Sequence, residues 1–81
     1  MTRRLTLYTR RDCGLCQEMK AAVRTVALEV PLEIEEVDVD QSSDLKEQYG
    51  SEVPVLLING RKAFKYRTTV RDLRKKLREV R

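Results

Sequence analysis

Apolar and polar positions follow two different periods at the start of this chain. Residues 5–8 alternate with a period of two, which predicts a short strand. Apolar residues then recur at three- and four-residue spacing from Cys16 to Val30, which predicts a helix over about residues 14–28 with one apolar face. Pro31 cannot continue that helix, so we expect the helix to end before it.

The middle of the chain predicts two strands and a short helix. Residues 32–39 read as a strand whose alternation changes phase at residues 35–36, where we expect a bulge or a shorter strand. Polar capping residues at 41–44 precede a short helix that ends near Tyr49, with Gly50 as its stop. Residues 55–58 are continuously apolar, which is typical of a strand buried on both faces.

The last third predicts a hairpin and a helix. Asn59 and Gly60 form a two-residue turn signal, so residues 62–66 should return as a strand. Thr69 can cap the final helix. The apolar residues of that helix share one face: Val70, Leu73, Leu77 and Val80. The order β-α-β-α-β-β-α predicts an α/β fold, with a mixed four-stranded sheet and helices on both faces.

Composition limits the classes of protein to consider. With 81 residues and no repeat or linker, residues 1–81 are expected to form one domain, and its small core places any chemistry at the surface. The charged fraction of 37% and the absence of a long apolar run indicate a soluble protein with no membrane partner. The first residues lack the features of a signal peptide, so we expect a cytoplasmic location.

Charge is distributed unevenly along the chain. Residues 61–81 hold ten basic and two acidic residues, a net charge of +8, so the first sixty residues carry −4. The basic end is a candidate docking face for acidic partners. The basic residues of the last helix are not interleaved with aromatic residues, so we expect no nucleic-acid partner.

The chain has only two cysteines, Cys13 and Cys16, at the start of the first predicted helix. In a reducing compartment such a pair is more often catalytic or metal-binding than a permanent crosslink. Unpaired N–H groups at the helix start, together with Arg10 and Arg11, should lower the pKa of the Cys13 thiol, whereas Asp12 opposes this effect.

The positions of the two cysteines predict different roles. Cys16 belongs to the apolar face and should be buried, so we expect Cys13 to attack a disulfide and Cys16 to resolve the mixed disulfide. A C-x-x-C pair is also half of a zinc site, but the chain has no histidine and no second cysteine pair, so no metal is expected. An inert structural pair is the remaining alternative.

Three segments resemble the glutaredoxin-like proteins of the thioredoxin superfamily, especially small members with a C-G-L-C motif: residues 7–16, 37–40 and 52–60. The resemblance implies that Pro54 follows a cis peptide bond and faces the cysteine pair, and that the backbone of Val53 pairs with a thiol substrate. It also implies that Arg10 holds a carboxylate of glutathione.

Two segments depart from the pattern of that family. Leu15 stands where a tyrosine is common, and Thr68 and Thr69 stand where two glycines receive the other carboxylate of glutathione. The resemblance therefore leaves two electron donors open, glutathione and a thioredoxin-type reductase. No tightly bound cofactor is implied, although some glutaredoxins bridge an iron–sulfur cluster between two copies through the first cysteine, which is Cys13 here.

Together these features predict a monomeric thiol–disulfide oxidoreductase that acts as a dithiol redox carrier on a disulfide-containing protein or small molecule. The alternative is a binding module that docks an acidic partner through its basic C-terminal helix. Tyr8 and Tyr66 are expected to be packing residues with solvated hydroxyl groups rather than site residues.

Overall fold

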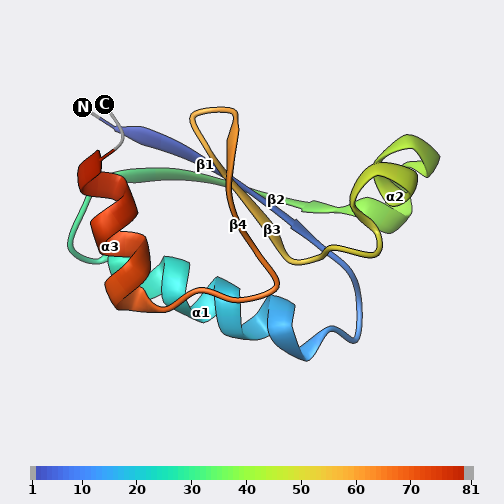
Figure 1. The fold of residues 1–81 in the computed structure, drawn as a ribbon, viewed down its shortest axis with the longest axis horizontal. Helices are drawn as coiled ribbons and strands as arrows, with labels where there is room; N and C mark the ends of the chain where they lie inside the picture. The colour runs from blue at the N-terminus through green and yellow to red at the C-terminus, as the bar shows by residue number, and fades with distance from the viewer. Residues whose placement is uncertain (1, 80–81) are drawn as a thin grey trace.

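The computed structural model describes residues 2–79, and its elements follow the predicted order (Figure 1). A 3₁₀ turn, η1 (Val39–Gln41), precedes the second helix. The other elements are β1 (Arg3–Thr9), α1 (Gly14–Ala27), β2 (Leu32–Asp38), α2 (Ser43–Tyr49), β3 (Val55–Ile58), β4 (Arg61–Lys65) and α3 (Val70–Glu79). Val80, assigned to the apolar face of the last helix, lies outside the described residues.

The four strands form one mixed sheet in the order β2-β1-β3-β4. β1 runs parallel to β2 and antiparallel to β3, and β3 pairs with β4 in a hairpin. In Figure 1, α1 and α3 lie together along one side of the sheet, and α2 stands apart at the end where β2 finishes. Tyr49 of α2 stacks on Tyr8, whose neighbour in β1, Leu7, is buried in the core on the opposite face. The predicted mixed sheet with helices on both faces is therefore confirmed.

The core fills the space between the sheet and the helices α1 and α3. Alternate residues of β1 and β3 point into it, and the apolar face of α1 and two leucines of α3 cover them. Burial of each such side chain contributes roughly 1.5–3 kcal/mol to folding. The buried cluster comprises Leu5, Leu7, Met19, Val23, Val26, Leu56, Ile58, Leu73 and Leu77.

The bulge or shortening expected in the second strand is wrong. β2 pairs with β1 without interruption from Arg3–Leu32 to Thr9–Asp38. Ile34 lies beside Leu5 on the face of α1, whereas Val37 lies beside Tyr8 on the opposite face. Leu32 at the start of β2 packs against the core and Val37 near its end is half-buried on the opposite face, whereas Ile34 between them is exposed, so the apolar positions change phase without a break in pairing. The sheet has its irregularity between β3 and β4 instead, at Leu56/Leu57.

The predicted caps and turns are confirmed. The Ser42 side chain accepts a hydrogen bond from the Leu45 N–H at the start of α2, and Thr69 Oγ1 accepts one from the Asp72 N–H at the start of α3. Asn59 has a φ of 51° and Gly60 a φ of 83°, as a two-residue hairpin turn with two left-handed positions requires.

Within residues 2–79, every helix is too short or too polar to cross a membrane.

Candidate functional site

Cys13 and Cys16 form a disulfide at the start of α1. Cys13 is the N-cap residue, with an extended backbone, and Cys16 lies one turn into the helix. Their Cα atoms are 5.2 Å apart, which is within the range that a disulfide spans. The start of α1 thus holds the two sulfur atoms close enough for a disulfide between them to form or be reduced.

The two sulfur atoms have different surroundings. Cys16 is only 1% exposed because it belongs to the apolar face of α1, whereas Cys13 is half-buried at the helix end. The Sγ atom of Cys13 accepts a hydrogen bond of 3.1 Å from the backbone N–H of Cys16. The first turn of α1 carries no acidic residue, so the N–H groups and the positive end of the helix dipole face Cys13 unopposed from within the helix. Cys13 is therefore the sulfur that a partner can reach, and a donor already points at it.

Asp12 adopts the left-handed backbone conformation immediately before Cys13. Its φ is 54° and its side chain is exposed. Aspartate tolerates this region better than most residues, because its short polar side chain can bond locally or to water. The sharp turn at Asp12 leads the chain from the end of β1 into the first turn of α1.

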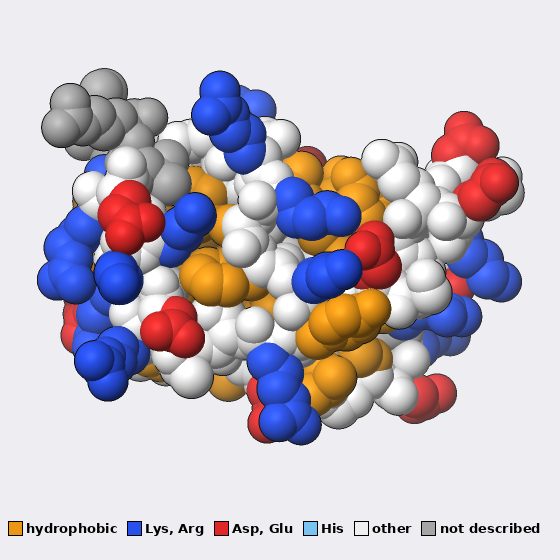
Figure 2. Space-filling model, in the orientation of Figure 1, with side chains coloured by type: hydrophobic (Ala, Val, Ile, Leu, Met, Phe, Trp, Pro, Cys, Tyr) orange, Lys and Arg blue, Asp and Glu red, His pale blue; other side chains and the backbone are white. Residues whose placement is uncertain are grey.

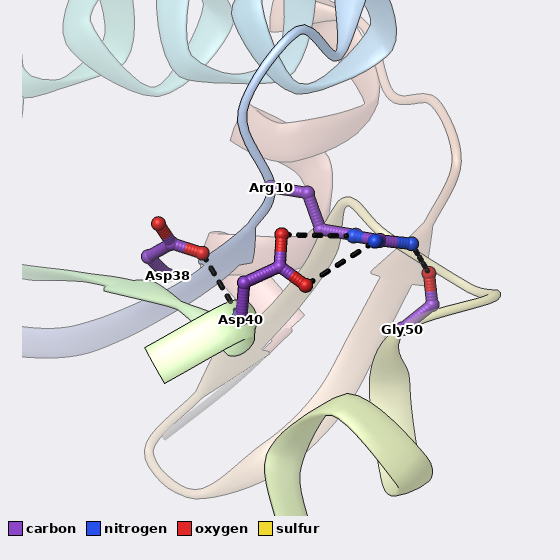
Figure 3. A network of polar contacts seen from close by, with 4 residues as sticks. All are labelled: Arg10, Asp38, Asp40 and Gly50. Atoms are coloured by element: carbon purple, nitrogen blue, oxygen red, sulfur yellow. Dashed lines mark hydrogen bonds and ion pairs between the residues drawn. The ribbon is translucent and has the colours of Figure 1, made fainter. Parts of the chain in front are cut away.

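Arg10 ties the loop before Cys13 to η1 and α2 (Figure 3). Its Nε and Nη2 atoms each lie 3.2 Å from a carboxylate oxygen of Asp40, and Nη1 donates to the carbonyl of Gly50 at 3.4 Å. Asp38 accepts a hydrogen bond from the Asp40 N–H at 2.9 Å and orders the same turn. Asp40 thus occupies the edge formed by Nε and Nη2, and the Gly50 carbonyl engages the remaining nitrogen, Nη1.

Asp40 is a site residue that the sequence does not single out. It lies in the segment of residues 37–40, but nothing local connects it to Arg10, which is thirty positions earlier. An arginine before the first cysteine and an aspartate after the second strand meet only because β1 and β2 are parallel neighbours.

A groove of about 610 Å³ lies beside the cysteine pair, between the first turns of α1 and the end of β2. Cys16 contributes to its wall, and the ion pair of Lys20 with Glu36, 2.7 Å long, joins two of its sides. The lining mixes basic and acidic side chains, so the groove has no single sign of charge. Its residues are Thr9, Arg10, Arg11, Cys16, Gln17, Lys20, Glu35, Glu36, Val37, Asp38 and Gln41.

The Val53–Pro54 peptide bond is cis, as the resemblance implied. Pro54 is buried, and its carbonyl accepts a hydrogen bond of 2.8 Å from the Tyr66 N–H. The next residue, Val55, pairs with Tyr8, so Val53 and Pro54 lie at the end of the sheet from which the chain runs to Cys13. Among residues 2–79, no hydrogen-bond partner is found for the backbone N–H and C=O of Val53.

The threonines before α3 have local partners. Thr69 caps the helix through its hydroxyl group, and the Thr68 hydroxyl donates to the Thr69 carbonyl at 3.4 Å. Tyr8 packs as expected, on Tyr49 with ring centroids 4.4 Å apart. Burial, and to a lesser degree the neighbouring Tyr49 and Glu35, raise the pKa of Tyr8. Tyr66 is 43% exposed and its ring lies beside the Lys65 ammonium, so its expected packing role stays a prediction.

Glu52 lies just before Val53 and binds two lysines. The Lys65 ammonium is 3.4 Å from one of its carboxylate oxygens, and the Lys62 ammonium is 3.5 Å from the other. The hydrogen bond from Lys65 and the charge of Lys62 lower the pKa of the Glu52 carboxyl. These two contacts fasten the segment before Pro54 to β4.

Comparisons with known proteins point to one family. The family model described as Glutaredoxin-like domain (DUF836) matches residues 4–78. A structural-genomics target protein from X. campestris is 31% identical, with a TM-score of 0.80, over 95% of this chain and 99% of that chain. A protein from Nitrosomonas europaea is 28% identical, with a TM-score of 0.76, over 91% and 89% of the two chains. A mutant thioredoxin from Halobacterium salinarum is 26% identical, with a TM-score of 0.64, over 93% and 70%.

Proposed function

This chain belongs to the glutaredoxin-like family, and from that premise we propose that it is a thiol–disulfide oxidoreductase whose dithiol is formed by Cys13 and Cys16. The observation that carries the proposal is the asymmetry of the pair. A reachable sulfur with a backbone donor stands at a helix start, and a buried sulfur lies within bonding reach of it. The first suits a nucleophile and the second a resolving thiol.

The first step is attack by the Cys13 thiolate on one sulfur of a substrate disulfide. A bond forms between Cys13 and that sulfur, and the substrate S–S bond breaks. The departing sulfur leaves as a thiolate and takes a proton from water. The N–H of Cys16 and the start of α1 stabilise the attacking anion before the bond forms.

The second step releases the substrate. The Cys16 thiol loses its proton and attacks the Cys13 sulfur, which restores the intramolecular disulfide and expels the second substrate thiolate. The substrate gains two electrons and two protons, and the protein is left in the oxidised form that the structure shows. A reductant must then return two electrons to the pair.

The backbone beside the cis proline is suited to hold the substrate during this exchange. The N–H and C=O of Val53 lack partners within residues 2–79 and lie at the same end of the sheet as the pair. An extended substrate segment can pair with them as an added strand residue. We assign this role to Val53 and a supporting role to Pro54.

For the electron donor we propose a dithiol protein, such as a thioredoxin-type reductase, rather than glutathione, and a reducing cytoplasmic setting. Two contacts support this choice. Asp40 and the Gly50 carbonyl engage the three nitrogens of Arg10 that would hold a glutathione carboxylate, and the Thr69 hydroxyl caps α3. Thr68 and Thr69 also lack the freedom of the glycines that form an anion-binding backbone in relatives.

Serine substitutions test the assignment of the two cysteines. Cys13→Ser should abolish the reduction of insulin and of a small disulfide, since no nucleophile remains at the helix start. Cys16→Ser should keep the first step and accumulate a mixed disulfide, detected as an added mass on the intact protein. Two variants with wild-type rates would show that the pair is not the redox centre.

An aspartate substitution tests the choice of donor. We expect the wild type to turn over with a thioredoxin reductase and only slowly with glutathione and glutathione reductase. Asp40→Ala frees the Arg10 guanidinium and should raise the glutathione-coupled rate without changing the other. Equal wild-type rates with the two donors would contradict the proposal.

One observation keeps a binding role as a second candidate. α3 buries Leu73 and Leu77 and leaves Arg71, Lys75 and Arg78 exposed on its outer side. Reversing the charge of these three residues should abolish capture of an acidic partner if docking is the main role. Unchanged capture would remove the reason for this candidate.

Arg74 is left out of that test because it already has a partner. Its Nε and Nη2 atoms bind the two carboxylate oxygens of Glu29 at 2.7 and 2.6 Å, which ties α3 to the turn after α1. Reversing Arg74 would disturb the packing of two helices as well as the charge of the surface.

A further inference from the structure

The turn after β4 presents an aromatic side chain at the same end of the sheet as Cys13. Tyr66 is 43% exposed, and its N–H donates to the carbonyl of Pro54 at 2.8 Å. Val55, which follows Pro54, pairs with Tyr8 near the end of β1, and the chain reaches Cys13 five residues later. Tyr66, the cis bond and the cysteine pair are therefore neighbours in the topology of the sheet.

The backbone at Tyr66 has a conformation that tyrosine seldom adopts. The Arg67 N–H donates to the Lys65 carbonyl at 2.8 Å, across a single residue, and the φ of Tyr66 is 69°. This geometry is a γ-turn of the rare positive-φ type, in which a bulky residue incurs a steric cost that glycine would avoid. Such strained positions cluster where a side chain has a function.

The surface around Tyr66 combines an apolar centre with positive charge. Figure 2 shows an apolar patch over the end of β4 and the first turn of α1 as they lie in Figure 1, with basic side chains beside it. The Lys65 ammonium lies 5.5 Å from the centre of the Tyr66 ring, and Arg67 is exposed. Leu15 and Val53 are partly exposed apolar residues of the segments that border it. We call these five residues the Tyr66 patch.

We propose that the Tyr66 patch selects the substrate, by receiving an extended protein segment whose reacting cysteine is flanked by a large apolar residue and an acidic residue. The inference rests on the proposed reduction of disulfides and names the class of protein substrate. The segment pairs with the Val53 backbone, its apolar side chain packs on the Tyr66 ring, and its acidic side chain meets Arg67.

Variants at position 66 test the aromatic contact. Two of the probes are disulfide-linked peptides, one with Leu and Glu beside the cysteine and one with Gly and Lys there. The third is a small symmetric disulfide that carries no amino-acid side chains. Tyr66→Ala should lower kcat/KM for the Leu-Glu peptide roughly tenfold, as expected for truncation of one aromatic anchor. It should leave the rate on the small disulfide unchanged.

Two further variants separate the side chain from the turn. Tyr66→Phe keeps the ring and should retain the preference for the Leu-Glu peptide. Tyr66→Gly removes the ring and the steric cost at φ 69° together, so it should lose the preference while the thermal unfolding midpoint stays level or rises.

A charge reversal tests the basic rim. Arg67→Glu should lower kcat/KM for the Leu-Glu peptide and raise it for the Gly-Lys peptide. Arg24→Glu is the matched control, because Arg24 is exposed in the last turn of α1, at the far end from Cys13, and the change in net charge is the same.

Each outcome bears on one of the two proposals. If Tyr66→Ala lowers kcat/KM equally for the peptides and the small disulfide, Tyr66 has only a structural role and the inference is overturned. No loss on any probe would overturn it as well. A wild type that reduces the small disulfide but shows no preference between the peptides rejects the Tyr66 patch only, whereas one that reduces no disulfide rejects the proposed function.

Discussion

Gly50 ends α2 at a position where a side chain does not fit. It is buried, and a Cβ atom built there would collide with the carbonyl oxygen of Lys46. Gly14, at the start of α1, has nothing within 4 Å of the corresponding position. The two glycines therefore serve as a matched pair for substitution.

Gly50→Ala should lower the free energy of unfolding by about 1–3 kcal/mol, because the backbone must shift to relieve the collision. Gly14→Ala should be neutral, or stabilise by up to about 1 kcal/mol, because alanine favours the helix. Urea denaturation of both variants measures the difference. Equal effects at the two positions would contradict the collision as the cause.

Glu52 makes the stability of the folded protein depend on pH in the acidic range. Its pKa is lowered in the folded protein, chiefly by the hydrogen bond from Lys65 and the charge of Lys62. A carboxyl with a depressed folded pKa stabilises the fold at pH values above its ordinary pKa, which is about 4.3, and this contribution is lost as the pH falls through the lower folded value.

Glu52→Gln should therefore be less stable than the wild type at neutral pH, and the difference should vanish in acid. Denaturation at a series of pH values between about 7 and 3 would measure this loss. Glu47→Gln removes an equal charge from an exposed position of α2 and is the control. A difference that persists unchanged at the lowest pH would rule out the carboxylate as its source.

At the scale of elements, α2 is the helix with the least burial. None of its residues is buried. It is attached through the stacking of Tyr49 on Tyr8 and through the bond from Arg10 to the carbonyl of Gly50. An element with little burial opens locally at low free energy.

Hydrogen exchange should show this difference between helices. Amides of α2 should exchange faster than those of α1, and Arg10→Ala should speed exchange in α2 while leaving α1 unchanged. Arg24→Ala, at an exposed position of α1, is the control. Equal protection of α1 and α2 in the wild type would contradict the weak attachment.

Elements whose signals are local could be predicted from the sequence. The Asn59-Gly60 turn, the Thr69 cap and the start of α1 at Cys13 each depend on residues within a few positions of one another. The uninterrupted pairing of β2 could not be predicted, because the burial of each face of that strand depends on helices elsewhere in the chain. Its change of phase therefore resembles a break, although the strand pairs without interruption.

The residues of the site likewise divide into those that a local signal predicts and those that depend on contacts between distant segments. The cysteine pair, its unequal burial and the cis proline could be predicted from a motif and a resemblance. The engagement of Arg10 by Asp40 depends on the parallel pairing of β1 with β2, and the exposed turn at Tyr66 on the hydrogen bond to Pro54. Neither contact has a signal within a single segment.

At the scale of the whole molecule, the two edges of the sheet carry opposite charge. The β2 edge exposes the acidic residues Glu33, Glu35 and Glu36. The β4 edge exposes the basic residues Arg61, Lys62 and Lys65. α3 adds further positive charge to the described chain. A charge distribution of this kind orients an approaching charged partner.

The reaction should therefore depend on salt for acidic substrates only. The value of kcat/KM for the Leu-Glu peptide should fall as ionic strength rises from about 0.02 to about 0.5 M, since the Debye length shrinks to a few ångströms. The neutral small disulfide should react at a constant rate. A parallel decline for the two substrates would point to an effect of salt on the protein itself.

The hydrogen bond from the Cys16 N–H to the Cys13 sulfur has a consequence for how the reaction can change by mutation. The donor belongs to the backbone, so it remains with any side chain at position 16 except that of proline. In the proposed mechanism, attack and release thus depend on different atoms of the same residue. A single exchange at Cys16 should then convert the proposed two-thiol catalyst into a one-thiol catalyst whose Cys13 thiolate keeps its backbone donor, with a free thiol in solution completing the turnover.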